Sequence, residues 1–296
     1  MDKPPLNDRI VAAFAAMSPQ RRMAARYMLD QPRDVALLSM REQARRAGVE
    51  PATMTRLAKS LGFAGYEEVR ALYAAAVREG GFGFAGRAGA QAARQKQKGD
   101  KGLAADMLEA ISRQIAQLAA GDGLERIAAA ARALAAARRV YCLGLRSSHA
   151  PAWQLHYVLA LISERTAFLD SLAAVGTDAL AHAGPKDALF VVSVRPYTRL
   201  TVETAAYAAS RGVTVVALTD SEVAPLAAVA RHVVLAPTDS PSFLHAMSPA
   251  FALAEVLAAL VAGAGGAAAL RALREKERHW SALDTHLQLE PPRKAP

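Results

Sequence analysis

Two short helical patterns meet around a glycine between Ser39 and Phe63, and this pairing is the strongest constraint that the sequence places on the fold. Ser39 can accept a hydrogen bond from a free backbone N–H at a helix start, and Glu42, three residues later, completes the pattern of a capping box. Gly48 can adopt the positive φ that a tight turn requires, and Pro51 suits the first position of a second helix. The segment therefore predicts a helix-turn-helix.

The second helix of this pair has one apolar stripe and one polar surface. The apolar residues recur at i, i+3, i+4 and i+7 and are expected to be buried: Met54, Leu57, Ala58 and Leu61. A helix fits the major groove of B-DNA, where Arg or Lys can bind guanine edges and Thr can contact a thymine methyl group. The predicted DNA-binding residues are Ser39, Thr53, Thr55, Arg56, Lys59 and Ser60. The alternative is an ordinary helical hairpin with a solvated face.

The distribution of charge favours DNA binding over that alternative. Residues 1–100 hold 17 Lys and Arg against 10 Asp and Glu, a net charge of +7, whereas residues 101–270 hold 13 of each. A phosphate-binding module gains affinity from each cation that it places locally, whereas solubility alone gives no reason to segregate charge. The basic excess therefore lies with the predicted DNA-binding helices.

The length of 296 residues suits two domains, and the 52% hydrophobic content comes largely from alanine, which indicates helix-rich packing. The apolar run at Phe251–Leu270 is interrupted by Glu255, so we expect a buried or interface helix there rather than a membrane span. The single cysteine, Cys142, excludes an intrachain disulfide, and we expect a reducing, cytoplasmic location.

The order of patterns along the chain predicts the domain boundaries. Helices are expected at Asn7–Met17, Pro19–Asp30 and Tyr66–Arg78, which place the helix-turn-helix domain at 1–79. Glycine, glutamine and cations without an apolar period predict a flexible linker at 80–102. The second domain is expected at 103–288 and a disordered tail at 289–296.

Beyond the linker, short β-branched runs alternate with helices. Helices are expected at Leu103–Ala119 and Gly123–Ala137, and strands at Val140–Leu143, Thr166–Leu169, Ala188–Val194, Val213–Leu218 and Val233–Leu235. Continuous apolar strands separated by helices imply a parallel sheet covered on both faces. The predicted fold is thus an all-α helix-turn-helix domain followed by an α/β three-layer domain with a five-stranded parallel sheet.

Two loops that follow strands are candidates for an anion site, because ligands of such sheets bind at the carboxyl ends of the strands, near helix N-termini. One loop starts at Gly144 and the other at Ser193, and each carries hydroxyl groups and an arginine. The predicted effector-binding residues are Gly144, Arg146, Ser147, Ser148, Ser193, Arg195, Tyr197 and Thr198. Helix capping is the alternative role for the hydroxyl groups, and for either loop alone it is the stronger explanation.

The chain resembles the RpiR/MurR-type bacterial transcriptional regulators, which join an N-terminal helix-turn-helix to a C-terminal SIS (sugar isomerase) domain. The resemblance rests on SMREQARRAGVEPATMTRLAKSLGFAGYEEVR and, in the second domain, on VYCLGLRSSHA, DALFVVSVRPYTRLTVE and GVTVVALTDSEVAPLAAVARHVVLAP. It implies a homodimer or homotetramer that binds a palindromic double-stranded DNA operator, with repression as the expected effect. It also implies an SIS domain that senses a phosphosugar or a related small anionic metabolite.

The resemblance places Thr53, Thr55, Arg56 and Lys59 on the DNA-reading helix, and Ser147, Ser148, Ser193 and Thr198 in the effector loops. Three departures stand out. SIS domains commonly have a glycine-rich first loop and a Ser-x-Ser-Gly-x-Thr second loop, whereas this chain has Arg146 in the first and Arg195-Pro196-Tyr197 in the second. Because these two departures in the loops add bulk and positive charge, the effector is not restricted to sugar phosphates. The third departure is Glu50, where similar regulators often have Ser.

Two other classes of protein remain alternatives. A sugar-phosphate isomerase of the SIS type needs a placed base, for which His149 and His245 are the candidates. A DNA-compacting protein needs only the basic first domain, but the neutral, anion-ready second domain argues against it. No metal-binding spacing, P-loop or dinucleotide glycine pattern is present, so no cofactor is expected.

Overall fold

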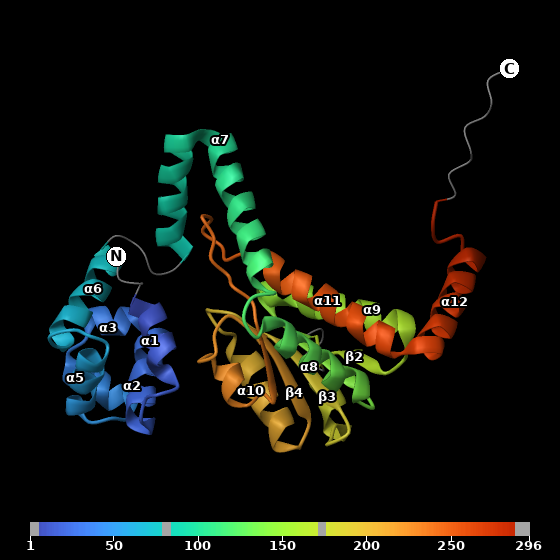
Figure 1. Ribbon diagram of the computed structural model, residues 1–296, viewed down its shortest axis with the longest axis horizontal. Coiled ribbons are helices and arrows are strands. Elements are labelled where there is room, and N and C mark those ends of the chain that lie inside the picture. The colour runs from blue at the N-terminus through green and yellow to red at the C-terminus, as the bar shows by residue number, and fades with distance from the viewer. Residues whose placement is uncertain (1–5, 79–83, 171–175, 288–296) are drawn as a thin grey trace. The chain divides into compact units, whose positions relative to one another are not determined.

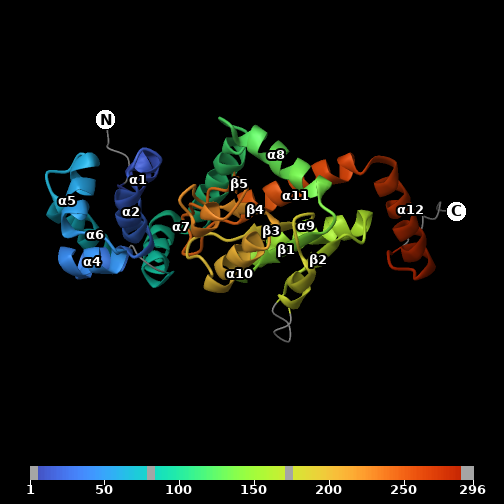
Figure 2. The same ribbon diagram turned by 90° about the horizontal axis from the view of Figure 1, so that it is seen from below.

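The computed structural model describes residues 6–78, 84–170 and 176–287 of the chain. The chain divides into two compact units, the first built mainly from residues before 117 and the second mainly from residues after it. Figures 1 and 2 together label the α-helices and strands of both units. Each unit has its own buried apolar core.

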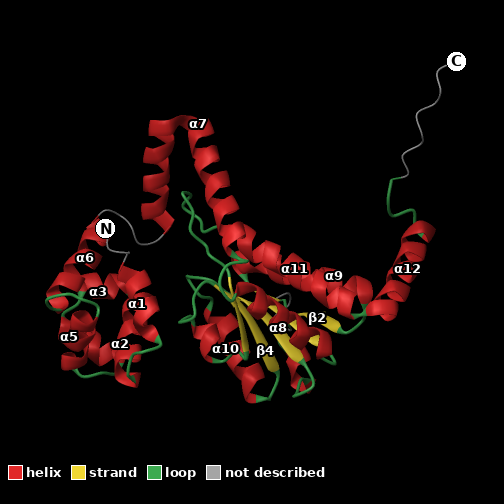
Figure 3. Cartoon of the chain, in the orientation of Figure 1, coloured by secondary structure: helices red, strands yellow, loops and turns green. Residues whose placement is uncertain are grey.

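The first unit is all-helical, as Figure 3 shows. Its first six helices are α1 (Leu6–Phe14), α2 (Pro19–Asp30), α3 (Pro32–Leu37), α4 (Met40–Ala47), α5 (Pro51–Ser60) and α6 (Tyr66–Arg78). The predicted bounds of α2 and α6 are confirmed, whereas α1 ends at Phe14 rather than at Met17. Helix α3 was not predicted, because six residues are too few to show an apolar period. The core that these helices share includes Ile10, Met28, Met54, Leu57 and Val69.

The segment expected to be a linker is helical instead. Helix α7 (Phe84–Gln117) is folded at Gly99, whose φ of 72° lies outside the helical range, and Figure 1 shows its two arms. The prediction of a flexible linker is therefore wrong for residues 84–102, and residues 79–83 lie outside the described part of the chain. Alanine, glutamine, arginine and lysine are good helix formers even without an apolar stripe. An ion pair of 2.8 Å between Lys98 and Asp106 joins the two arms.

The second unit contains a five-stranded parallel sheet with the strand order β2-β1-β3-β4-β5. Its strands are β1 (Val140–Gly144), β2 (Thr166–Phe168), β3 (Ala188–Val192), β4 (Thr214–Thr219) and β5 (His232–Leu235). The predicted sheet is thus confirmed. Gly144 of β1 lies opposite Val192 of β3, so the loops that follow these two strands begin side by side.

Helices cover both faces of this sheet and give the predicted three layers (Figure 2). Three helices pack on one face, where Cys142 and Phe190 point: α8 (Gly123–Ala136), α9 (His149–Ile162) and α11 (Ser248–Ala264). Helix α10 (Arg199–Ser210) and the 3₁₀ helices η3 (Asp178–His182) and η4 (Pro225–Ala228) pack on the other face, against Tyr141 and Leu189. Burial raises the pKa of the Cys142 thiol to about 12, so this thiol is an apolar core group.

Helix α12 (Gly266–Ala282) follows α11 after Gly265. The predicted buried helix in the apolar run is α11, which buries Leu253, Leu257 and Val261. Among residues 6–78, 84–170 and 176–287, no single helix is long and apolar enough to span a membrane. Only α11 and α12 taken together, which are bent by 108°, reach that length and composition. The tail predicted at 289–296 lies outside the described residues.

Candidate DNA-binding and effector sites

The turn between α4 and α5 has the predicted geometry. The Ser39 hydroxyl accepts a hydrogen bond from the backbone N–H of Glu42 at 3.3 Å and so caps α4. Gly48 ends α4 with a φ of 68°, and Pro51 occupies the first turn of α5. Because glycine tolerates positive φ without strain, the chain reverses here within three residues of the end of α4.

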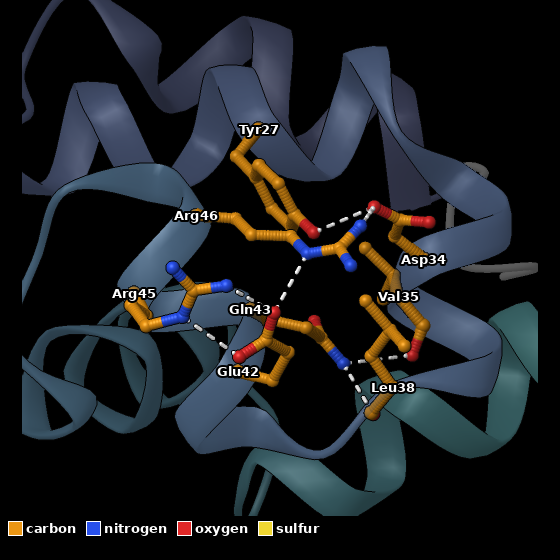
Figure 4. Close-up of polar contacts among 8 residues, drawn as sticks. All are labelled: Tyr27, Asp34, Val35, Leu38, Glu42, Gln43, Arg45 and Arg46. Carbon is orange, nitrogen blue, oxygen red and sulfur yellow. Dashed lines mark hydrogen bonds and ion pairs between the residues drawn. The ribbon is translucent and has the colours of Figure 1, made fainter.

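The carboxylate of Glu42 binds two arginines on its own helix instead of completing the capping box. Arg45 and Arg46 donate hydrogen bonds to it at 2.9 Å, and Arg46 also donates to Asp34 of α3 at 2.8 Å (Figure 4). The hydrogen bonds from Arg45 and then Arg46 lower the pKa of Glu42 to about 2. Asp34 in turn accepts a hydrogen bond from the Tyr27 hydroxyl of α2 at 3.0 Å. This network links α2, α3 and α4 by their polar surfaces.

A buried glutamine fixes α4 to its neighbours beneath this network. Gln43 is fully buried, and its amide donates hydrogen bonds to the carbonyl oxygens of Val35 at 3.1 Å and Leu38 at 2.8 Å (Figure 4). Those carbonyls belong to the last turn of α3 and its C-cap, where backbone acceptors lack helical partners. The Gln43 carbonyl oxygen accepts a hydrogen bond from the Tyr66 hydroxyl of α6. One side chain therefore satisfies polar groups from two other helices.

The predicted polar surface of α5 is confirmed only in part. Arg56 and Lys59 are exposed about one turn apart and form no ion pair within the described residues. Thr53 is only 7% exposed, so its predicted place on the outer surface is wrong. The reason is that α5 packs against α2 as well as α4, which widens its buried face beyond the apolar stripe.

The other predicted hydroxyl groups have local partners. Thr55 is half-buried, and its hydroxyl lies 3.5 Å from the sulfur of Met40. The Ser60 hydroxyl donates to the carbonyl of Leu57 at 2.8 Å, within its own helix. The described geometry thus leaves Arg56 and Lys59 as the side chains on α5 best placed to contact DNA.

An open hollow of about 630 Å³ lies beside the start of α5. Its lining comes from α2, α4, the turn and α5: Gln20, Arg45, Gly48, Val49, Glu50, Ala52, Thr53 and Arg56. Arg45 and Arg56 give it positive charge, whereas the exposed Glu50 precedes α5 without a side-chain capping bond and opposes that charge. The hollow can therefore accept an anionic group on its arginine side.

The first candidate effector loop is tightly packed where β1 meets α9. A Cβ atom on Gly144 would lie 2.1 Å from the backbone oxygen of Ser148 and 2.8 Å from the Cβ of Ala152, so only glycine fits. Arg146 is exposed and adopts a φ of 55°, in the region that favours glycine. Ser148 is buried and Ser147 is half-buried at the N-terminus of α9, where free backbone N–H groups favour anions.

The second candidate loop joins β3 to α10. The buried Ser193 hydroxyl accepts a hydrogen bond from the backbone N–H of Thr198 at 3.3 Å, and Thr198, the N-cap of α10, makes no side-chain capping bond. The Thr219 hydroxyl donates to the Ser193 carbonyl at 2.7 Å, and the Arg195 backbone N–H donates to the Asp220 carboxylate at 3.4 Å. The end of β4 therefore supports the loop that follows β3.

Three polar atoms in and after this loop are buried without a hydrogen-bond partner in the described part of the chain: Arg195 Nε, the Tyr197 hydroxyl and Thr201 Oγ1. Burial, and next the charge of Asp220, raise the pKa of Tyr197. An unpaired buried polar atom costs about 1–3 kcal/mol, so this cluster gains stability from a ligand that pairs it. Thr201 and Asp220 were not among the predicted site residues, although Asp220 directly follows β4 and ligands of such sheets bind where strands end.

The two histidines considered as catalytic bases have different surroundings. His149 begins α9, is exposed, and packs edge-on against Phe168 with ring centroids 5.0 Å apart. His245 is 8% exposed and belongs to the first unit. In the described residues, no three His, Cys, Asp or Glu side chains are arranged to hold a metal ion.

Models of two known domains match the chain. The helix-turn-helix domain of the rpiR family matches residues 6–78, and the SIS domain matches residues 133–260. An RpiR transcription factor from Sphaerobacter thermophilus, solved as its sugar isomerase domain, is 34% identical over 60% of this chain and 98% of that chain, with a TM-score of 0.56. The chain belongs to the RpiR family of transcription factors.

A second solved structure is similar in fold over nearly the whole chain. The NanR protein of Vibrio vulnificus, complexed with ManNAc-6P, is 20% identical over 94% of this chain and 99% of that chain, with a TM-score of 0.56. A search of curated protein sequences finds no match. Membership of the RpiR family assigns transcription regulation, DNA binding and an SIS domain to this chain.

Proposed function

We propose that this RpiR-family protein is a cytoplasmic repressor that binds a palindromic DNA operator as a homodimer or homotetramer. DNA binding is supported by Arg56 and Lys59, two exposed cations on the second helix of the helix-turn-helix that form no ion pair with the part of the chain that the structure describes. Two copies of α5 would enter successive major grooves at half-sites roughly 34 Å apart, or at a multiple of that distance.

We further propose that the SIS domain senses a small anionic metabolite, with a phosphosugar as the leading class. The loops after β1 and β3 bring hydroxyl groups and helix N-termini to one edge of the sheet, together with Arg195 Nε and the Tyr197 hydroxyl, which are buried without a geometric hydrogen-bond partner among the described residues. The NanR complex with ManNAc-6P supports a phosphosugar. Arg146 and Arg195, in place of smaller residues, favour an effector that carries additional negative charge.

The effector would change operator binding only through a difference in its affinity for DNA-competent and DNA-incompetent arrangements of the protein. A thermal-shift screen of phosphosugars and small organic acids tests for this ligand, because a molecule that binds the native state raises the melting temperature. Turnover of a phosphosugar by the purified protein without DNA would instead favour the isomerase alternative.

Arg56→Ala should weaken binding to a duplex that the protein has selected from a random-sequence pool. The expected loss is about 1–3 kcal/mol if Arg56 contacts a base edge. Titrations of the selected duplex and of a scrambled duplex at one salt concentration measure it. Arg70→Ala, on α6, is the matched control. Equal losses on both duplexes would identify a phosphate contact, and unchanged affinity would remove Arg56 from the interface.

Ser193→Ala should leave operator binding largely intact but reduce the response to the effector. The substitution removes a hydroxyl at the carboxyl edge of the sheet and leaves α5 unchanged. The melting-temperature shift produced by the best phosphosugar of the screen, with ManNAc-6P included, measures the response. Ser210→Ala, at the far end of α10, serves as control because its hydroxyl bonds only its own helix. An unchanged shift in Ser193→Ala would place the effector elsewhere.

A further inference from the structure

A second cationic site lies at the opposite edge of the sheet from the effector loops. An open hollow of about 590 Å³ is bordered by the C-terminal half of α8 and by the residues at the amino ends of the strands. All five strands are parallel, so their amino ends share one edge, whereas the loops after β1 and β3 lie at the carboxyl edge. We name this space the amino-edge hollow.

The amino-edge hollow is positively charged, although residues 101–270, which form it, carry no net charge. Its lining includes five cations, Arg132, Arg138, Arg165, Lys186 and Arg231, against a single carboxylate, Asp187. Arg138, Arg165, Lys186 and Arg231 each lie within two residues of the start of a strand. The fold therefore concentrates at one edge cations that are scattered through the sequence.

Two of these cations have structural partners. Arg138 donates hydrogen bonds to both carboxylate oxygens of the buried Asp187, at 2.9 and 2.7 Å. Arg165 donates to the carbonyl of Ala137 at 3.2 Å, at the end of α8. Asp187 is thus already neutralised, and it does not compensate the remaining charges of the hollow.

The other three cations, Arg132, Lys186 and Arg231, form no ion pair among the described residues and are exposed. Burial, and then the charges of Arg231 and Arg132, lower the pKa of His232 in the same lining. Two unpaired guanidinium groups therefore act on one half-buried imidazole. Three like charges around one concavity repel each other, and an anion placed between them would relieve that repulsion.

We propose that the amino-edge hollow binds a compact polyanion carrying several phosphate groups. The register places Arg231 level with Leu189 of β3, three residues beyond Lys186. With strands about 4.8 Å apart and a rise of about 3.3 Å per residue, the positions of Lys186 and Arg231 are roughly 14 Å apart, which suits a short phosphate chain held by long side chains rather than one phosphate. Arginine binds phosphate oxygens in a bidentate manner, and the hydroxyl of Thr214 in the lining adds a donor. The volume lies within the range of small-molecule sites.

Calorimetric titration of the full-length protein with inorganic tripolyphosphate at fixed salt tests this proposal. The double variant Arg132→Gln/Arg231→Gln should bind tripolyphosphate at least about tenfold more weakly than the unmodified protein, because each of the two substitutions removes a charge-assisted contact with the anion. Arg126→Gln, which removes one positive charge from α8 outside the hollow, should alter the dissociation constant by no more than about twofold. Ser193→Ala should retain the affinity, which separates this hollow from the effector loops.

Several outcomes would overturn the proposal. If the double variant bound tripolyphosphate as tightly as the unmodified protein, the proposal would be wrong. It would also be wrong if Arg126→Gln lost as much affinity as the double variant, because the attraction would then depend on overall charge. Loss of affinity in Ser193→Ala alone would place tripolyphosphate at the effector loops. If the double variant lost affinity for a random DNA duplex while tripolyphosphate bound neither protein, the hollow would be a nucleic-acid contact. Far-UV circular dichroism and melting temperatures verify that each variant is folded.

Discussion

Replacing Gln43 with leucine should destabilise the helix-turn-helix unit by about 3 kcal/mol or more. The Gln43 amide satisfies the carbonyls of Val35 and Leu38, and its oxygen accepts from the Tyr66 hydroxyl. Leucine has a similar volume but no polar atoms, so these groups would stay buried without partners, at about 1–3 kcal/mol each. Since whole domains are stable by only about 5–15 kcal/mol, operator binding at physiological temperature should fall with the folded fraction.

Urea denaturation followed by circular dichroism measures the free energy of unfolding of the Gln43→Leu protein. Tyr66→Phe removes one hydroxyl and should produce a smaller loss of about 1–2 kcal/mol. Gln31→Leu is the matched control, because Gln31 is exposed and its side chain makes no capping bond. A Gln43→Leu protein as stable as the Gln31→Leu protein would show that the buried network does not hold α3, α4 and α6 together.

Gly144→Ala should destabilise the SIS domain by about 3 kcal/mol and disturb the first effector loop. The added Cβ would lie 2.1 Å from the Ser148 backbone oxygen, which cannot move aside as the end of a flexible side chain can. Either β1 or the start of α9 must shift, and overpacking of this kind costs about 1–3 kcal/mol or more. Both the unfolding free energy and the melting-temperature shift with effector should therefore decrease.

Gly184→Ala provides the control for that experiment. Gly184 lies in the loop before β3, has no positive φ, and has open space where a Cβ would be placed. Its backbone N–H donates to Asp187, a bond that alanine keeps. The expected change is within about 0.5 kcal/mol. If the two alanine variants were equally stable, the close contact at Gly144 would have to be relieved at no cost, contrary to the geometry described above.

The sequence predicts most of the fold because its local signals are strong and agree with each other. Ser39, Gly48 and Pro51 each favour one backbone conformation, and the β-branched runs mark every strand. The second arm of α7 was predicted as the helix from Leu103, whereas residues 84–102 were predicted as a linker because their helical tendency comes from propensity rather than from an apolar period. Thr53 was misplaced because α5 packs against α2, a helix distant in sequence, as well as against α4, and the apolar stripe alone does not show how wide its buried face is.

The candidate sites also differ in how far they could be predicted from local sequence features. The effector loops were predictable because strand ends and hydroxyl residues are local features. Gln43 gave no signal, since a glutamine on a polar helix face looks solvated until α3 and α6 are in place. The amino-edge hollow was hidden because its cations are spread from Arg132 to Arg231 and only the parallel register gathers them. The burial of Gln43 and the clustering of these cations both depend on long-range packing, which sequence periodicity does not describe.

The helical character of α7 sets a geometric condition on the segment that precedes the SIS domain. A helix advances 1.5 Å and turns 100° with each residue, so adding or removing one residue within an arm of α7 changes the length of that arm and the direction in which its last residue points. A flexible coil would absorb such a change almost without effect. Evolutionary change in the length of α7 is therefore expected to occur in steps close to whole helical turns, or to be concentrated at the fold beside Gly99.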